Sequence, residues 1–224
     1  MRATFTQTAN FSEATFTQNA YFRGATFTQN ANFIGATFTQ NANFIGATFT
    51  QNADFSWATF TQNAHFSEAT FTQNAYFRGA TFTQNAHFSR ATFTQNADFS
   101  WVIFTQNAHF IRATFTRYIY FQDATFNGEM TFRSTYFEKY APTFAEGSDS
   151  ARFSDQVNWE DSNFSVRSDS QPIELGSATL GDKTFSVPFG TVVFDPGSWD
   201  EKTKEYTHMS VTCCRIQRSP QHQE

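Results

Sequence analysis

An eleven-residue phrase repeated twelve times in tandem dominates the chain. It reads Ala-Thr-Phe-Thr-Gln-Asn-Ala-x-Phe-x-x and occupies residues 3–134 of the 224. The copies begin at Ala3, Ala14, Ala25, Ala36, Ala47, Ala58, Ala69, Ala80, Ala91, Val102, Ala113 and Ala124. A short fixed period predicts a stacked repeat architecture, because a single unit cannot bury its apolar face alone.

Each phrase contains two five-residue units separated by one residue, as in residues 25–29, Asn30 and residues 31–35. Both units read Ala, polar, Phe, x, x, so Phe recurs at alternating gaps of six and five residues. Those gaps do not keep one stripe on a helix, and Thr, Phe and Asn are weak helix formers. In a short strand, Ala and Phe share one face. Each unit is therefore predicted to be a very short strand and a corner, with Ala and Phe pointing inward.

Units such as Ala-Asn-Phe-Ser-Glu at 9–13 and Ala-Asp-Phe-Ser-Trp at 53–57 and 97–101 resemble the pentapeptide-repeat family, whose units read Ala-(Asp/Asn)-(Leu/Phe)-x-x. The resemblance implies an all-β fold, a right-handed quadrilateral β-helix (a β-solenoid) with four units per coil. The spacer, Asn30 and its equivalents, departs from that pattern. It predicts a coil of 22 residues instead of 20, and six regular coils in residues 3–134. Asn suits a looser corner, because it tolerates left-handed backbone and can bond the main chain.

Phenylalanine is the regular core residue of this chain. It occurs 31 times, while only 16% of the residues are charged. Each buried Phe contributes ~1.5–3 kcal/mol relative to exposure, and Ala fills the gaps between rings. A disordered low-complexity tract would be poor in aromatic residues. The composition therefore favours an ordered solenoid.

The phrase degenerates after residue 134, which divides the chain into two expected parts. Residues 1–166 form the β-helix, regular over 3–134 and degenerate over 135–166, with a bulging corner near 146–150. Residues 167–224 form a small C-terminal β cap and a disordered tail that begins at Arg215. Strand candidates in the cap are 184–187, 191–194 and 206–213, bounded by Pro and Gly.

The sequence carries no motif for chemistry. It has no Gly-rich phosphate loop, no catalytic triad order and no metal-ligand spacing, and the adjacent pair Cys213-Cys214 cannot complete a zinc site. We expect no catalytic, cofactor-binding or metal-binding residues, and hence no enzyme. Two outward sets remain as candidates for surface recognition. His65, His87 and His109 would stack in one column, as a divalent-metal site or as a plain polar ladder. Trp57 and Trp101 would share one edge, as a contact surface or as corner covers.

The distribution of charge and the threonine pattern distinguish the candidate functions. Residues 1–134 contain seven basic and six acidic groups, and residues 135–224 contain eight and fourteen, so neither part is a basic footprint for nucleic acid. The first expectation is a structural or interaction scaffold with a protein partner. The resemblance implies an alternative, a DNA mimic that occupies DNA gyrase, although mimicry requires a strongly negative rod. Thr-x-Thr ladders on two faces suggest a third, ice binding.

The beginning of the chain supports two further expectations. No secretory segment and no apolar run of membrane length is visible, so we expect a cytoplasmic protein without membrane contact, with secretion open if the N-terminus is truncated. The first coil would leave its four Phe rings and its strand edges open. Open edges pair with other chains, which predicts a head-to-head homodimer through this coil or an additional N-terminal segment.

Overall fold

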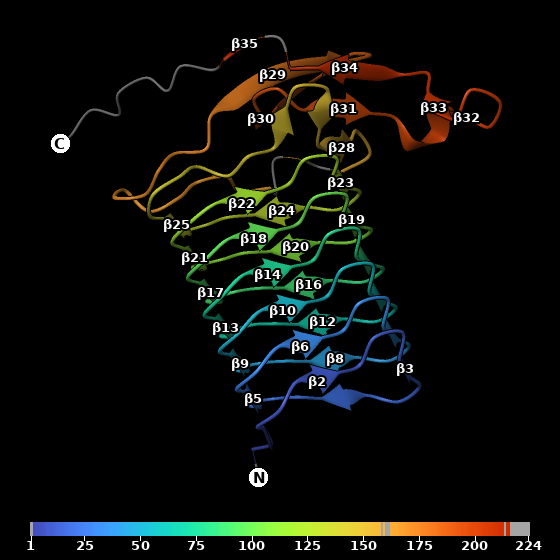
Figure 1. The fold of residues 1–224 in the computed structure, drawn as a ribbon. Helices are drawn as coiled ribbons and strands as arrows, with labels where there is room; N and C mark the ends of the chain where they lie inside the picture. Colours follow the sequence, from blue (N-terminus) through green and yellow to red (C-terminus); the bar gives the residue numbers. More distant parts are fainter. Residues whose placement is uncertain (1, 158, 160–161, 213, 216–224) are drawn as a thin grey trace.

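The computed structural model describes residues 2–157, 159, 162–212 and 214–215. Parallel coils stack along one axis into a four-sided β-helix, with the N-terminus at one end and a β cap at the other (Figure 1). The one helical element in the described part of the chain is a short 3-10 turn, η1 (Pro196–Ser198). The predicted all-β solenoid with a small C-terminal β cap is confirmed.

Four sheets form the four sides. The strands of the regular coils pair in parallel and belong to the four sheets in turn along the chain. Sheet 1 contains β1 (Thr4–Phe5), β5 (Thr26–Phe27), β9 (Thr48–Phe49), β13 (Thr70–Phe71), β17 (Thr92–Phe93), β21 (Thr114–Phe115) and β25 (Tyr136–Phe137). Sheet 2 contains β2 (Ala9–Asn10), β6 (Ala31–Asn32), β10 (Ala53–Asp54), β14 (Ala75–Tyr76), β18 (Ala97–Asp98) and β22 (Ile119–Tyr120).

The other two sides follow the same rule. Sheet 3 contains β3 (Thr15–Phe16), β7 (Thr37–Phe38), β11 (Thr59–Phe60), β15 (Thr81–Phe82), β19 (Ile103–Phe104), β23 (Thr125–Phe126), β28 (Arg152–Ser154), β31 (Val192–Phe194) and β34 (Met209–Val211). Sheet 4 contains β4 (Ala20–Tyr21), β8 (Ala42–Asn43), β12 (Ala64–His65), β16 (Ala86–His87), β20 (Ala108–His109) and β24 (Met130–Thr131).

The register between coils is 22 residues. Phe27 pairs with Phe5 on one side and with Phe49 on the other. The rings of Phe27 and Phe49 stack with centroids 4.8 Å apart and planes 3° apart. The predicted 22-residue coil is thus confirmed, and the twelve phrases make six regular coils. Odd-numbered phrases form sheets 1 and 2, whereas even-numbered phrases form sheets 3 and 4.

The core consists of four columns of Phe rings with Ala between them. Within a column the rings stack face to face, as Phe33 does on Phe55 at 4.7 Å. Between columns they meet edge to face, as Phe33 does with Phe44 at 5.5 Å and 86°. Edge-to-face contacts place the positive ring edge on the negative ring face. From Phe27 onward these rings are fully buried in the regular coils, and those of the first coil are partly buried.

The corners correct one expectation about the spacer. No spacer Asn adopts a positive φ; the left-handed residue is the eleventh of each phrase, for example Gly46 (φ 63°) or Arg90 (φ 58°). The extra residue widens the spacer corner, so the chain turns there without a left-handed residue. Instead the spacers form a ladder, in which Asn85 N donates to Asn63 Oδ1 at 3.2 Å. The spacers whose side chains bond the backbone of the next coil in this way are Asn19, Asn52, Asn63, Asn74, Asn85 and Asn107.

Beyond residue 134 the coils become irregular and lead into the cap. β26 (Ala145–Glu146) and β27 (Asp149–Ser150) form an antiparallel hairpin, after which β28 rejoins sheet 3. A bridge between Thr135 and Val166 extends the stack further. The cap contains the hairpin β29 (Leu175–Leu180) and β30 (Lys183–Pro188), and β35 (Cys214–Arg215) pairs with β29. β31 joins β28 in parallel, so the cap continues sheet 3.

The strand candidates of the cap have different outcomes. Residues 184–187 lie in β30 and residues 192–194 of the second candidate form β31. The third candidate is divided between β33 (Glu205–Tyr206), which pairs with β32 (Trp199–Asp200), and β34. β29 was not expected, because it buries the small residues Gly176 and Ala178 and lacks bulky alternation. The expected disordered tail begins one residue too early, because Arg215 pairs with Gly176 as the last residue of β35. Cys213 and residues 216–224 of the expected tail lie outside the described residues.

Candidate interaction edges

In the 22-residue register, residues at the eighth position of alternate phrases stack. They form two outward columns on opposite sides of the β-helix. The column on sheet 2 is Asn10, Asn32, Asp54, Tyr76, Asp98 and Tyr120. The column on sheet 4 is Tyr21, Asn43, His65, His87, His109 and Thr131. Side chains that lie eleven residues apart in the sequence therefore face different surroundings.

The three histidines stack as parallel rings. Centroids of His65 and His87 are 4.9 Å apart, and those of His87 and His109 are 5.1 Å apart. Two nitrogens bound to one ion lie at most ~4.2 Å apart, because each Zn–N bond is ~2.1 Å. Parallel rings at these spacings do not converge on an ion. No group of three or more His, Cys, Asp or Glu in the described residues is placed to hold a metal.

Burial determines the charge of this histidine column. Desolvation lowers the pKa of His65, His87 and His109. The pKa of His87 falls to about 4, because repulsion from His109 and His65 adds to its burial. The Glu129 carboxylate opposes this shift at His109. The column is consequently a neutral polar ladder at pH 7.

Trp57 and Trp101 lie at the eleventh position of two odd-numbered phrases, in the corner that follows sheet 2. They are two coils apart and are 58% and 51% exposed. Trp57 lies against the corner of the next coil, since a Cβ on Gly79 would stand 2.4 Å from its Cε3 atom. Trp57 thus covers a glycine corner with one part of its ring and exposes the rest. The two tryptophans share one edge, as expected, and Trp57 covers a corner, as one of the two interpretations expects.

Aromatic and acidic side chains surround the two tryptophans. We name the outward column of sheet 2 and the corner that follows it the tryptophan edge. Asp54 Oδ1 accepts from Ser56 N at 2.9 Å, and Asp98 Oδ1 accepts from Ser100 N at 2.9 Å, so both carboxylates are held beside the corner. The acidic groups on this edge in the regular coils are Glu13, Asp54, Asp98 and Asp123, and Arg78 is basic. The edge is therefore acidic and aromatic.

The corner that follows sheet 4 has the opposite charge. We name it the arginine edge; it carries Arg23, Arg90, Arg112 and Arg133, with Glu68 as its acidic group. Arg90 Nη1 lies 3.4 Å from Glu68 Oε1, and both side chains are more than half exposed. A groove of about 390 Å³ follows this corner, lined by Ser67, Glu68, Ser89, Arg90, Ile111, Arg112 and Arg133. The net charge of the solenoid gives no sign of this edge, because the charges of the two edges nearly cancel.

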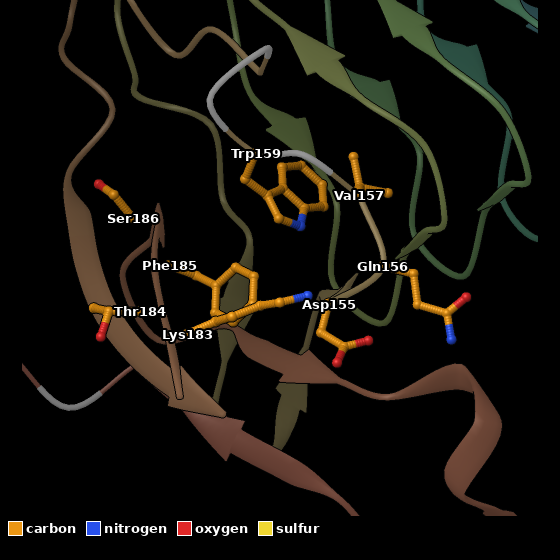
Figure 2. A pocket seen from close by; sticks show the side chains of 8 residues that line it. All are labelled: Asp155, Gln156, Val157, Trp159, Lys183, Thr184, Phe185 and Ser186. Carbon is orange, nitrogen blue, oxygen red and sulfur yellow. The ribbon is translucent and has the colours of Figure 1, made fainter. Parts of the chain in front are cut away.

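A further cavity of about 540 Å³ lies between the last coil and the cap hairpin, lined in part by Asp155, Trp159, Lys183 and Phe185. Lys183 extends from β30 toward Asp155 (Figure 2). Burial and the neighbouring Asp195 raise the pKa of Asp155, and Lys183 lowers it. The Trp159 indole is fixed by donation from Nε1 to Ser154 O. The cavity is thus lined by the carboxyl group of Asp155 and the ammonium group of Lys183, which the sequence gives no reason to pair.

Comparisons with known proteins agree with this architecture. The family model of pentapeptide repeats matches nine copies, over residues 2–44, 33–81 and 77–125. The comparisons with curated proteins and with solved structures find no match. Among the described residues there is no helix of the length and apolarity needed to cross a membrane. Because the matched ranges together cover more than half of the chain, the chain belongs to the pentapeptide-repeat family.

Proposed function

We propose that the chain is a non-enzymatic interaction scaffold that binds a protein partner along the tryptophan edge. The observation that carries the proposal is the exposure of Trp57 and Trp101 on one corner. Protein interfaces are enriched in Trp and Tyr, and a few buried aromatic anchors supply most of the binding energy. Two large exposed rings on a rigid framework supply such anchors with little loss of conformational entropy on binding.

The backbone under these rings supports the proposal. Both tryptophans have positive φ, 59° for Trp57 and 63° for Trp101. A side chain in this conformation costs roughly 1–2 kcal/mol, whereas the equivalent residues Gly35 and Gly79 avoid that cost. The hydrogen-bonded corner therefore holds each tryptophan in one backbone conformation, as it holds the other non-glycine residues at this position. Asp54 and Asp98 beside them favour a partner with a basic rim, since complementary charge accelerates and orients docking.

Site-specific photo-crosslinking tests the proposal. A photoreactive phenylalanine analogue replaces Trp57 or Trp101 in the full chain, in cells of the organism from which the chain derives. Glu68 is the matched control, because it occupies the same position of the phrase, with φ 61°, on the arginine edge. We expect one discrete protein adduct from the tryptophan positions and none from position 68. Adducts from position 68 alone, or no adduct at all, would contradict the proposal.

Two alternatives have weaker support. The tryptophan edge carries four acidic groups over six coils, which at ~4.8 Å per coil is about one charge per 7 Å, against one per ~1.7 Å in duplex DNA. This density disfavours gyrase mimicry, and an unchanged supercoiling rate of gyrase is expected in the presence of the chain.

Ice binding is favoured by the unbroken threonine column of sheet 1, from Thr4 to Thr114. Against it, the second threonine of several phrases donates its hydroxyl to a backbone carbonyl of the preceding coil, as Thr50 Oγ1 does to Phe27 O at 3.1 Å. That hydroxyl is then already engaged with the backbone. Ice crystals grown in the presence of the chain should keep their ordinary shape, and faceted crystals would favour this alternative over the scaffold.

A further inference from the structure

The arginine edge lies on the corner that follows sheet 4, diagonally opposite the tryptophan edge. We propose that its groove binds a compact phosphate-bearing ligand, with Arg90, Arg112 and Arg133 as the anion-binding groups. The groove has a volume of about 390 Å³, within the range typical of small-molecule sites. This inference goes beyond the protein interaction proposed above and does not depend on it.

The protein neutralises only part of the positive charge in the groove. Within the described residues, Arg90 pairs with Glu68, while Arg112 and Arg133 have no acidic partner. Arg90 and Arg112 occupy the same position in adjacent coils of the even-numbered phrases, and Arg133 belongs to the coil after them. Adjacent coils are ~4.8 Å apart, so the three side chains can converge on one small ligand. Without such a ligand, three like charges lie close together.

The types of donor favour phosphate over carboxylate. A guanidinium group presents paired N–H donors in a plane, which match two oxygens of one anion. Ser67 and Ser89 also line the groove, and each hydroxyl group can donate a hydrogen bond to an anion. A tetrahedral phosphate has oxygens for both the guanidinium forks and a hydroxyl donor, whereas the two oxygens of a carboxylate lie in one plane. A diphosphate reaches across more than one coil.

Two of the arginines are held in place by the corner backbone. Arg90 N donates to Ile111 O at 2.9 Å, and Arg112 N donates to Arg133 O at 3.0 Å. Both residues have positive φ, 58° and 57°. The equivalent position in earlier coils is Gly24 and Gly46, which take this conformation without strain. The rigid corner sets the directions from which the side chains enter the groove, which reduces the entropy lost on binding.

Isothermal titration calorimetry of the full chain with inorganic pyrophosphate at low ionic strength tests the site. We expect saturable binding to one site, with orthophosphate weaker because it engages fewer groups. Arg112→Gln and Arg133→Gln should each weaken binding about tenfold. Arg112→Lys retains the charge but loses the paired donors, so its affinity for pyrophosphate should fall several-fold. Glu68→Gln should tighten binding, because it removes the acidic group from the groove.

Arg78→Gln on the tryptophan edge is the matched control, since Arg78 occupies the tenth position of its phrase as Arg133 does. It should leave the affinity unchanged. The thermal unfolding midpoint of each unliganded variant establishes that these exposed substitutions preserve the fold. The proposal is overturned if pyrophosphate shows no saturable binding, if Arg78→Gln weakens binding as much as Arg112→Gln, or if citrate binds more tightly than pyrophosphate.

Discussion

At the scale of single residues, the eleventh position of the phrase decides how each corner is made and what it exposes. Glycine occupies it in four phrases, at Gly24, Gly35, Gly46 and Gly79, all with positive φ. That glycine was the available sequence signal for a left-handed corner. It was obscured because Glu68, Trp57 and Arg90 stand at the same position in other phrases. The inward direction of Phe and Ala, by contrast, followed directly from the alternation of a strand.

Substitution of two corner glycines should separate backbone strain from steric overlap. Gly46→Ala places a Cβ in open space at φ 63°, so it should cost about 1 kcal/mol of unfolding free energy. Gly79→Ala, at φ 66°, adds an overlap with Trp57 and should cost on the order of 1 kcal/mol more. Urea unfolding midpoints measure both. The additional destabilisation by Gly79→Ala should disappear when Trp57 is replaced by Gly. Equal destabilisation by Gly46→Ala and Gly79→Ala in the native chain would refute the contact with Trp57.

His87 should make the stability of the protein depend on pH. Its pKa is lowered from 6.5 to about 4 in the folded chain, so the unfolded chain binds the proton more readily between these values. Stability from this group is complete above pH 6.5 and is lost as the pH falls toward 4. The effect is on the order of 1 kcal/mol, after allowance for solvent screening of a partly exposed ring. Unfolding midpoints of the native chain and His87→Asn should converge at low pH; parallel curves would contradict the assignment.

At the scale of elements, no regular strand is stable by itself. Each strand of the regular coils contains two residues, so its stability comes from stacking on the coils above and below. The period of the phrase made this predictable, because identical residues can stack only if one register is kept. The cap has no repeat to supply a register, and β29 relies on small buried residues that resemble a loop in the sequence. The repeat therefore predicts the strands of the regular coils but not those of the cap.

Phe82 should contribute far more to stability than its neighbour Thr83. Phe82 is fully buried and stacks between Phe60 and Phe104 at centroid distances of 4.8 and 5.1 Å. Phe82→Ala leaves a cavity and should cost ~3–5 kcal/mol of unfolding free energy. Thr83→Ala retains the backbone bond from N to Phe60 O and should cost ~0.5 kcal/mol or less. Comparable chemical denaturation midpoints for the two variants would show that the inward assignment is mistaken.

At the scale of the whole molecule, the coil separates charges that the sequence intermingles. Alternate phrases contribute to diagonally opposite corners, so an almost neutral solenoid acquires an acidic aromatic edge and a basic edge. The repeat predicts the stacking of the three histidines and the edge that Trp57 and Trp101 share. The arginine groove has no such signal, because basic and acidic residues of successive phrases nearly cancel along the chain and separate only when the coil forms. The cap cavity depends on a non-repetitive contact and had no sequence signal.

The weaker burial of the first coil predicts self-association of the 224-residue chain. The rings of Phe5, Phe11, Phe16 and Phe22 are partly buried, whereas those of the second coil are fully buried. Pairing of two such ends would cover the rings and the free strand edges in a closed two-fold dimer. Sedimentation velocity at micromolar concentration should therefore show a dimer. A monomer whose first-coil amides are fully protected from exchange would eliminate this prediction.

Twenty-two residues complete one coil, and this register alone places odd and even phrases on different edges. Pulsed electron-spin resonance between labels at Thr26 and Thr114, with both native cysteines replaced by Ser, measures it directly. The two positions share sheet 1 and are four coils apart. At ~4.8 Å per coil, the predicted separation of the label sites is about 19 Å. A separation near ~38 Å, as an eleven-residue coil requires, would contradict the account.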